Sequence, residues 1–196
     1  MDNQQPKVSE QEYGWFAGFF DGEGMITFAV QAKAGKNGAP KVHPYLILSA
    51  TDTESLNTAT SILDRAGLAY HVSWVQPKGQ TRGGRPHKAA WRMEISGFKR
   101  GVRFLMWLTP ALRTKHKKAD LVLAYAQKRQ AHSDFRTPIT PDEWELVLEM
   151  RRLNDRGVGP SYLKAMKLNT ERPGASSEQL AANGRKGAEA RWGIRD

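Results

Sequence analysis

Residues 15–24 have the sequence Trp15-Phe16-Ala17-Gly18-Phe19-Phe20-Asp21-Gly22-Glu23-Gly24, in which an aromatic segment runs directly into two carboxylates. Between Tyr13 and Phe20 the chain contains five aromatic residues and no charge. This composition predicts a helix that is apolar on every side and therefore buried. The C-terminal end of a helix carries a partial negative charge, so Asp21 and Glu23 are disfavoured there unless a cation or a set of donors compensates them. The end of this helix is therefore the first candidate for a functional site.

Small residues form a stripe along the same helix. Their offsets of three and four place them on one face: Gly14, Ala17, Gly18 and Asp21. Because small side chains let another backbone come unusually close, the stripe predicts a tight contact with a second helix.

Glycines flank Glu23 on both sides. We expect them to let the chain leave the helix through unusual backbone angles and to expose carbonyl oxygens. Carboxylate and carbonyl oxygens are the ligands that Mg²⁺ and Ca²⁺ prefer. One interpretation is therefore a divalent metal site around Glu23. The other is a glycine-terminated helix followed by an ordinary turn, since Gly and Asp are common at helix ends.

The length and composition limit the architecture. At 196 residues the chain can build one core and a short appendage. It contains no cysteine, which excludes disulfides, thiol catalysis and thiolate zinc sites. No apolar run is long enough to cross a bilayer, and residues 1–11 are polar, without the apolar core of a signal peptide. We therefore expect a soluble, intracellular protein of the cytoplasm, the nucleoid or an organelle matrix, with no membrane partner.

The positive charge is concentrated in one part of the chain. The formal net charge is +10, and residues 76–118 contain twelve Lys or Arg against a single acid, Glu94. Such a cationic half favours a surface that binds a polyanion, most often nucleic acid. The alternative is a basic face that is only solvated.

The first half of the chain predicts a helix, a β-hairpin and a second helix. Apolar residues alternate with polar ones after Gly24, residues 35–40 form a turn, and residues 41–50 return as a second strand. Asp52 is a plausible N-cap for a helix through Arg65, with Gly67 as its stop. The polar face of this hairpin carries Thr27, Ala29, Gln31, Lys33, Lys41, His43 and Tyr45.

The second half predicts another hairpin and further helices. Residues 70–76 and 88–96 are its strands, although the alternation does not decide which face of the first one points inward. Helices are expected over residues 99–108, from Lys115 onward and over 143–153, the last with the capping box Thr140-Pro141-Asp142-Glu143. We place the domain at residues 1–155 and a basic tail at 156–196, either disordered or an accessory DNA contact with a short helix over 177–192.

The α-β-β-α-β-β-α order, the small-residue helix ending in Asp-Gly-Glu-Gly and the basic second half together resemble the LAGLIDADG homing endonucleases. Residues 16–24 fill the nine places of the family motif without a gap, with aromatic residues for its leucines and Glu23 for the usual final Asp. Residues 108–123 are similar to the basic stretch of the single-motif, homodimeric branch. The resemblance covers roughly residues 10–155 and implies an α+β fold with an antiparallel four-stranded saddle sheet and additional C-terminal helices.

The resemblance also implies a chemistry, which is hydrolysis of one phosphodiester in each strand of a long, pseudo-palindromic site in double-stranded DNA. Glu23 and the carbonyl of Gly22 would hold Mg²⁺, and Mn²⁺ or Ca²⁺ could occupy the same position. Lys115 matches the basic residue near the family's active site, where it would steady developing charge. The alternative is a lysine that contacts phosphate or solvent. Asp21 is expected to be a structural cap rather than a ligand.

The motif occurs once, so the resemblance implies a homodimer whose interface is the stripe of Gly14, Ala17, Gly18 and Asp21. The expected DNA contacts lie on the outward strand faces, in the loop of residues 76–87 and in the basic stretch. They are Thr27, Gln31, Lys33, Lys41, His43, Tyr45, Lys78, Arg82, Arg85, Lys88, Arg92 and Lys117.

One departure from the family pattern bears on turnover. Residues 49–52 read Ser-Ala-Thr-Asp where relatives often carry a polar Gln near the metal-bound water, so Thr51 or Ser55 would have to take the place of that Gln.

Three functions therefore stay open. They are a DNA endonuclease for intron or intein homing, a binding protein on the same fold, and a basic structural protein. The binding protein would be a maturase acting on intron RNA or a non-cleaving DNA-binding regulator. Glu23 favours the endonuclease, because a pure binder needs no carboxylate aimed at phosphate.

Overall fold

The computed structural model describes residues 7–34, 39–76, 79, 88–131, 138–154 and 160–170. Its elements, in chain order, are α1 (Glu10–Glu23), β1 (Gly24–Ala34), β2 (Ala39–Ala50), α2 (Thr53–Arg65), β3 (His71–Val75), β4 (Ala90–Ser96), α3 (Phe98–Leu108), the 3₁₀ turn η1 (Thr109–Ala111), α4 (His116–Ala131), α5 (Pro141–Leu153) and α6 (Pro160–Thr170). The predicted α-β-β-α-β-β-α order is confirmed, with the further helices after it.

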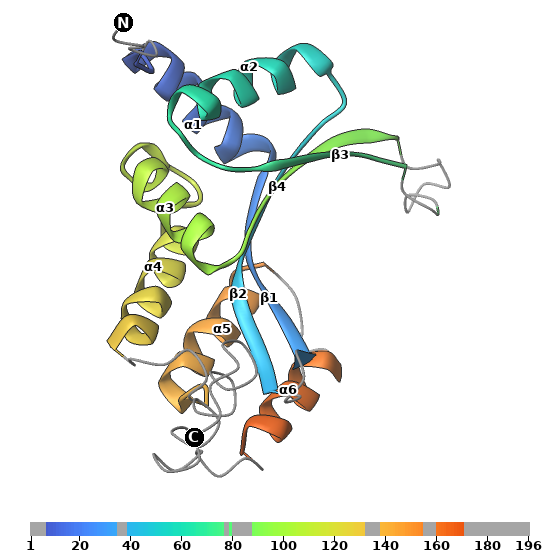
Figure 1. The fold of residues 1–196 in the computed structure, drawn as a ribbon, viewed down its shortest axis with the longest axis vertical. Coiled ribbons are helices and arrows are strands. Elements are labelled where there is room, and N and C mark those ends of the chain that lie inside the picture. The colour runs from blue at the N-terminus through green and yellow to red at the C-terminus, as the bar shows by residue number, and fades with distance from the viewer. Residues whose placement is uncertain are drawn as a thin grey trace, which may run out of the picture.

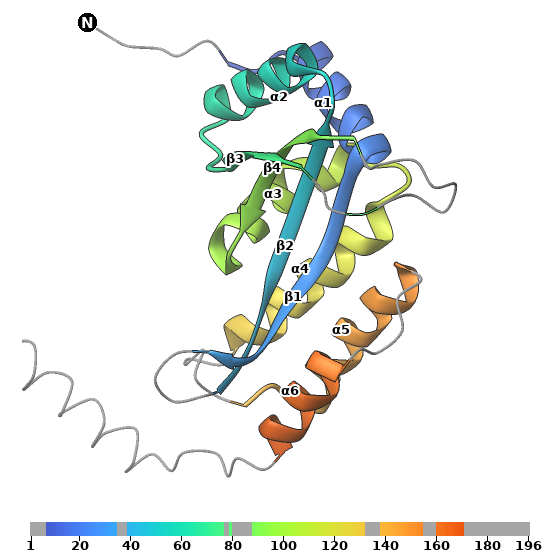
Figure 2. The same cartoon turned by 90° about the vertical axis from the view of Figure 1, so that its right-hand side faces the viewer.

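The four strands form one antiparallel sheet in the order β1-β2-β4-β3. Figures 1 and 2 show that this sheet is strongly twisted, with α1 and α2 at one end of the long β1–β2 hairpin and α5 and α6 near the other. Helices α3 and α4 lie between these pairs and against the sheet. The β2–β4 pairing joins the two hairpins, so the expected four-stranded sheet is confirmed.

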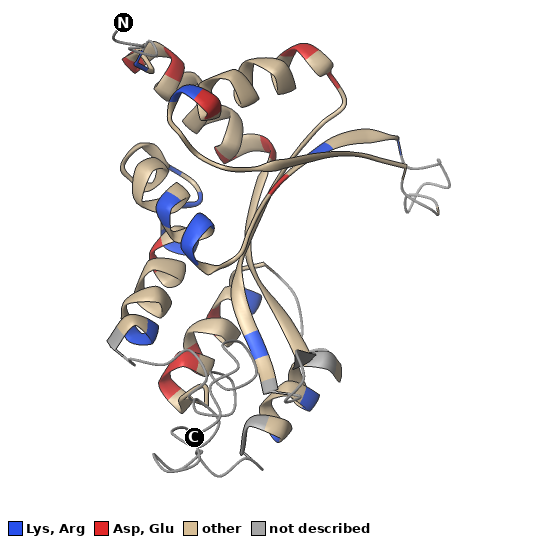
Figure 3. Ribbon diagram, viewed as in Figure 1, with Lys and Arg blue, Asp and Glu red and all other residues tan. Residues whose placement is uncertain are grey.

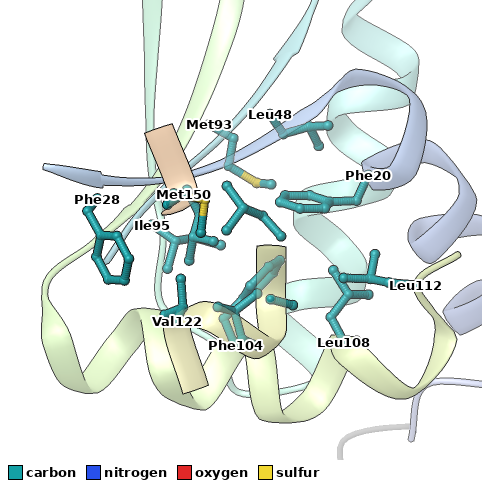
Figure 4. Packing of buried hydrophobic residues seen from close by; sticks show 14 of the residues in the cluster. Phe20, Phe28, Leu48, Met93, Ile95, Phe104, Leu108, Leu112, Val122 and Met150 are labelled. Carbon is teal, nitrogen blue, oxygen red and sulfur yellow. The ribbon is translucent and has the colours of Figure 1, made fainter. Parts of the chain in front are cut away.

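The core lies between the helices and one face of the sheet (Figure 4). The alternation predicted for the strands holds, because the buried strand residues are Ile26, Phe28, Leu46, Leu48, Met93 and Ile95. They meet Phe104 and Leu105 of α3 and Val122 of α4 in one cluster. Gly101 allows this packing, since a Cβ there would lie 2.7 Å from the Cβ of Pro44 in β2. Within the described part of the chain, no helix is long and apolar enough to cross a membrane.

Local side-chain caps fix where helices begin. Ser9 and Glu12 form a capping box at the start of α1, and Asp52 accepts from the N–H groups of residues 54 and 55 at the start of α2. The capping box predicted at Thr140 and Glu143 is confirmed at the start of α5, where Pro141 is the first helical residue.

Helix α6 extends the core beyond residue 155, where the sequence pattern placed the end of the domain. Ala165 and Tyr162 are buried in the main cluster, and the Tyr162 hydroxyl donates to the carbonyl oxygen of Phe28 at 3.0 Å. Asn154 donates to the carbonyl of Ile26 at 3.1 Å. These two bonds satisfy carbonyl groups of the edge strand β1. The boundary at 155 was therefore wrong, because a short helix between Gly- and Pro-containing segments has a weak pattern. The helix expected over 177–192 lies outside the described residues.

Candidate active site at the end of helix α1

Helix α1 has one buried face and one exposed face. Phe16, Ala17 and Phe20 are at most 2% exposed, whereas Gly14 and Gly18 lie at the surface. The prediction of a helix buried on every side was therefore wrong. The described residues cover the face that packs on α2, the sheet and α3, where Phe16 and Phe20 contact the ring of Phe104.

The exposed small residues of α1 differ from the predicted stripe. The side chain of Ala17 points into the protomer's own core, so it is not part of an exposed stripe. The exposed row is Gly14, Gly18 and Gly22, and a Cβ added at any of the three would meet no atom within 4 Å. Trp15, 38% exposed, stacks at a tilt on Phe19 beside this row.

The chain leaves α1 through ordinary backbone angles. Gly24 has φ −76° and ψ 155°, which any residue can adopt, so the prediction of unusual angles at this glycine was wrong. The glycine is needed for space, because a Cβ there would lie 2.7 Å from the ring of Phe20. Strand β1 can therefore start immediately after Glu23, and the carboxylate is placed at the junction of helix and sheet.

Asp21 holds the segment that leads into α4. Its carboxylate accepts hydrogen bonds from the backbone N–H groups of Arg113 (2.6 Å), Thr114 (3.3 Å) and Lys115 (3.1 Å), and from the Thr114 hydroxyl (3.0 Å). Burial alone would raise the pKa of Asp21, but these bonds outweigh burial and hold the pKa below its ordinary 3.8. Asp21 thus makes the bonds expected of a structural cap, although its partners lie 92 to 94 residues away.

Lys115 places its ammonium against the last turn of α1. Its Nζ donates to the carbonyl oxygen of Asp21 and, at 3.5 Å, to that of Gly22. Burial lowers the pKa of Lys115 below its ordinary 10.5; the charges of Asp21 and Glu23 oppose this effect, and that of Lys118 adds to it. No basic residue lies in the last turn of α1 itself, so Lys115 supplies the cation that this helix end requires.

Glu23 remains uncompensated by a direct contact. It is the exposed last residue of α1, and it forms no hydrogen bond or ion pair with another described residue. Its carboxylate and the carbonyl of the exposed Gly22 are oxygen donors of the kind that Mg²⁺ and Ca²⁺ bind. The donor chemistry therefore fits a divalent ion. Over the described ranges, no cluster of three or more His, Asp or Glu side chains is arranged to hold a metal.

The polar face of the sheet carries most of the strand residues predicted to contact DNA. Opposite positions on β1 and β2 pair as Thr27 with Tyr45 and Gln31 with Lys41. Gln31 and Lys41 are exposed, His43, Tyr45 and Arg92 are half-buried, and Thr27 is 8% exposed. Burial, together with Lys41, lowers the pKa of His43, which favours its neutral form at neutral pH.

The other predicted DNA contacts are distributed differently. Lys88 is exposed just before β4, whereas Lys117 lies on α4 and pairs with Glu149 of α5 at 3.7 Å. Lys78, Arg82, Arg85 and the side chain of Lys33 lie outside the described residues.

Strand register adds residues to this face that the sequence pattern did not identify. Arg92 pairs with Ser49 of β2 and with Ser73 of β3, which places all three in one row across the sheet. Glu94 pairs with His71 of β3, and the Glu94 carboxylate lies 3.6 Å from Arg92. Because the alternation in β3 is ambiguous, the sequence did not predict that Ser73 and His71 lie on the polar face. Only the pairing with β4 decides their face.

Charge is unevenly distributed over the helices (Figure 3). Lys99, Arg100 and Arg103 are exposed on α3, and basic residues continue into the start of α4. Acidic positions lie on α1 and α2, including Glu10, Glu12 and Glu54, and also on α5. Positive charge on α3 and at the start of α4 therefore lies between these two acidic regions.

Comparison with known proteins identifies the fold. No family model matches the sequence, and no curated protein sequence matches it. Among solved structures, the archaeal intron-encoded homing endonuclease I-Vdi141I, complexed with DNA, matches with a TM-score of 0.57 and 12% identity, over 82% of this chain and 98% of its own. The group I intron-encoded homing endonuclease I-CeuI, also complexed with DNA, matches with a TM-score of 0.58 and 14% identity, over 84% of this chain and 78% of its own. The homing endonuclease I-TnaI matches with a TM-score of 0.51 and 16% identity, over 82% of this chain and 97% of its own. The sheet, the helices around it and the motif helix α1 of this chain therefore have the fold of the LAGLIDADG homing endonucleases.

Proposed function

We propose that this protein is a site-specific, divalent-metal-dependent endonuclease that cuts double-stranded DNA as a homodimer. The observation that carries the proposal is the exposed, unpartnered carboxylate of Glu23 at the point where α1 passes into the polar sheet. A nucleic-acid binder gains nothing from a free carboxylate near phosphates, because the two negative charges repel each other.

The exposed row on α1 supports the homodimer. Gly14, Gly18 and Gly22 leave space above the helix, and the half-exposed Trp15 and Phe19 border it. A second copy of α1 placed across this row could approach closely and bury these aromatic rings. A two-fold axis there would bring the two Glu23 residues together and match a pseudo-palindromic DNA site.

The proposed chemistry is hydrolysis of one phosphodiester in each DNA strand. Glu23 and the Gly22 carbonyl would hold Mg²⁺, with Mn²⁺ and Ca²⁺ as alternative occupants. A divalent ion in that position activates a water and stabilises charge on the phosphate. Lys115 would donate to the phosphate as negative charge develops, and Thr51 and Ser55 are the remaining polar candidates to orient water.

The polar sheet face would bind the DNA half-site in the major groove. Its residues offer base-edge donors and acceptors in Gln31, His43, Tyr45 and Arg92, and Lys41 offers a phosphate contact. We further propose that the enzyme serves homing of an intron or intein, since I-Vdi141I and I-CeuI are described as intron-encoded. Binding of intron RNA would indicate a maturase instead.

Cleavage of a selected DNA site tests the proposal. DNA bound in Ca²⁺ would be selected from a random duplex library and then incubated with Mg²⁺ or with a chelator. We expect the wild-type chain to cut in Mg²⁺ only, and Glu23→Gln to bind the same DNA but cut it about 100-fold more slowly or worse, because the metal ligand is lost.

Glu10→Gln is the matched control, since it removes the same charge from an exposed position in the first turn of α1. This variant should cut at the wild-type rate. Specific binding without metal-dependent cleavage by the wild type would refute the nuclease and leave a DNA-binding regulator.

A further inference from the structure

Lys115 donates to an oxygen atom that the proposed metal would also use. Its ammonium contacts two consecutive carbonyl oxygens at the C-terminal end of α1, those of Asp21 and Gly22. The Gly22 oxygen is also the backbone ligand that the proposed function assigns to the metal. One oxygen therefore has two candidate cations.

The two cations cannot share this oxygen closely. A divalent ion binds an oxygen ligand at about 2.0–2.6 Å, and the Lys115 ammonium lies 3.5 Å from the same atom. At such distances like charges repel strongly, above all where one of them is partly buried. A metal bound to this oxygen would therefore repel the ammonium from it.

The structure allows the lysine side chain to move while its backbone stays in place. The N–H of Lys115 donates to Asp21 at 3.1 Å, and the two preceding N–H groups donate to the same carboxylate. These bonds fix the main chain at the start of α4. The ammonium sits at the end of a flexible four-carbon chain, where Asp21 and Glu23 attract its positive charge and Lys118 repels it.

We propose that Lys115 is a placeholder cation: it neutralises the end of α1 in the metal-free protein, and a divalent ion displaces it from the Gly22 carbonyl. The displaced ammonium is then free to reach the phosphate, so metal binding and lysine positioning are coupled. This inference rests on the proposed metal site at Glu23. It assigns Lys115 two successive partners, the helix carbonyls before metal binding and the phosphate after it.

Metal affinity distinguishes this role from a purely catalytic one. Binding of Mn²⁺ to the full chain would be followed by electron paramagnetic resonance of the free ion, without DNA and with uncut DNA. We expect Lys115→Met to bind Mn²⁺ about five- to tenfold more tightly than the wild type, because the competing charge is gone. The same variant should cut DNA more slowly, so affinity and activity move in opposite directions.

Two further variants separate displacement from a general charge effect. Lys118→Met removes a neighbouring charge that contacts neither carbonyl in the described hydrogen bonds, and it should change Mn²⁺ affinity by less than about twofold. Lys115→Arg keeps a cation on the helix end and should bind Mn²⁺ no more tightly than the wild type. If Lys115→Met folds poorly, Lys115→Gln removes the same charge with a polar side chain and should likewise bind Mn²⁺ more tightly than the wild type.

The outcomes are distinct. Mn²⁺ binding that Glu23→Gln abolishes, with Lys115→Met at wild-type affinity or weaker, would refute the placeholder role alone. Mn²⁺ binding that Glu23→Gln leaves unchanged would show that the metal does not bind at Glu23, and would overturn both this inference and the proposed metal site.

Discussion

At the scale of single residues, the negatively charged and polar groups at the end of α1 differ in how they are compensated. Backbone N–H groups satisfy Asp21, the Lys115 ammonium satisfies two carbonyl oxygens, and Glu23 is left without a direct partner. The local sequence pattern predicted a helix end in need of a cation, and only the family resemblance gave Asp21 and Glu23 different roles. Local pattern could not separate them, because the groups that bind Asp21 lie more than 90 residues away.

Asp21 makes a testable contribution to stability. Asp21→Ala should lower the free energy of unfolding by about 1–2 kcal/mol, the usual cost of losing a helix-capping side chain. Because the folded-state pKa lies below 3.8, the unfolded chain binds the proton more readily. The contribution is therefore fully present above pH 3.8 and is lost as the pH falls through the folded-state pKa.

Urea unfolding of the wild type and the variant, at neutral pH and at acidic pH, checks this expectation. Asp120→Asn is the control, since Asp120 is exposed and its contact in the described structure is the local ion pair with His116. A difference between wild type and Asp21→Ala that stays constant down to the lowest pH would contradict the account.

At the scale of elements, the inward faces of β1, β2, β4, α2 and α4 could be predicted from the sequence, whereas those of β3, α1 and α6 could not. Alternation is local, so the buried residues of β1, β2 and β4 followed directly from it. The face of β3 depends on its pairing with β4, and the weak pattern of α6 gave no sign that Tyr162 and Ala165 are buried. The prediction that α1 is buried on every side failed for another reason. Aromatic residues lie on both faces of this helix, so its sequence does not indicate that one face is exposed.

The open face of α1 makes Gly18→Leu a clean probe of the dimer. A Cβ at Gly18 meets nothing within 4 Å in the protomer, so the variant should fold. Across a close helix pair the added side chain would cost about 1–3 kcal/mol, and a two-fold axis doubles that cost. We expect the dimer to weaken about 30-fold or more, with DNA cleavage lost at the same protein concentration.

Sedimentation equilibrium measures the dissociation constant. Gln127→Leu places the same side chain at an exposed position on α4 and should leave the dimer unchanged. If Gly18→Leu remained dimeric and active, the exposed glycine row would not be the interface.

At the scale of the whole molecule, the order of elements and the antiparallel four-stranded sheet could be predicted, while the order of the strands within the sheet could not. The α-β-β-α-β-β-α order follows from local periodicity and capping residues, such as the box at Thr140. The β1-β2-β4-β3 arrangement instead depends on which hairpins meet across the chain. The pairing of the two hairpins places Arg92, Ser49 and Ser73 in one row on the polar face. The sequence pattern did not predict this row.

The separation of charge also belongs to this scale. The polar sheet face carries Lys41 and Arg92, the exposed face of α3 carries Lys99, Arg100 and Arg103, and Glu23 lies where the sheet begins. One protomer offers one such carboxylate. The central claim is therefore that two protomers, each with its own Glu23, cut the two DNA strands.

Mixed dimers test this claim most directly. Wild-type and Glu23→Gln chains would be combined in varying proportions at fixed total concentration and allowed to exchange subunits, and the rate of double-strand cleavage in Mg²⁺ would be measured. If both Glu23 residues of a dimer are required, the rate falls with the square of the wild-type fraction, to about one quarter when half of the chains are wild type. A rate that falls in direct proportion, to about one half, would show that single chains act alone and would contradict the account.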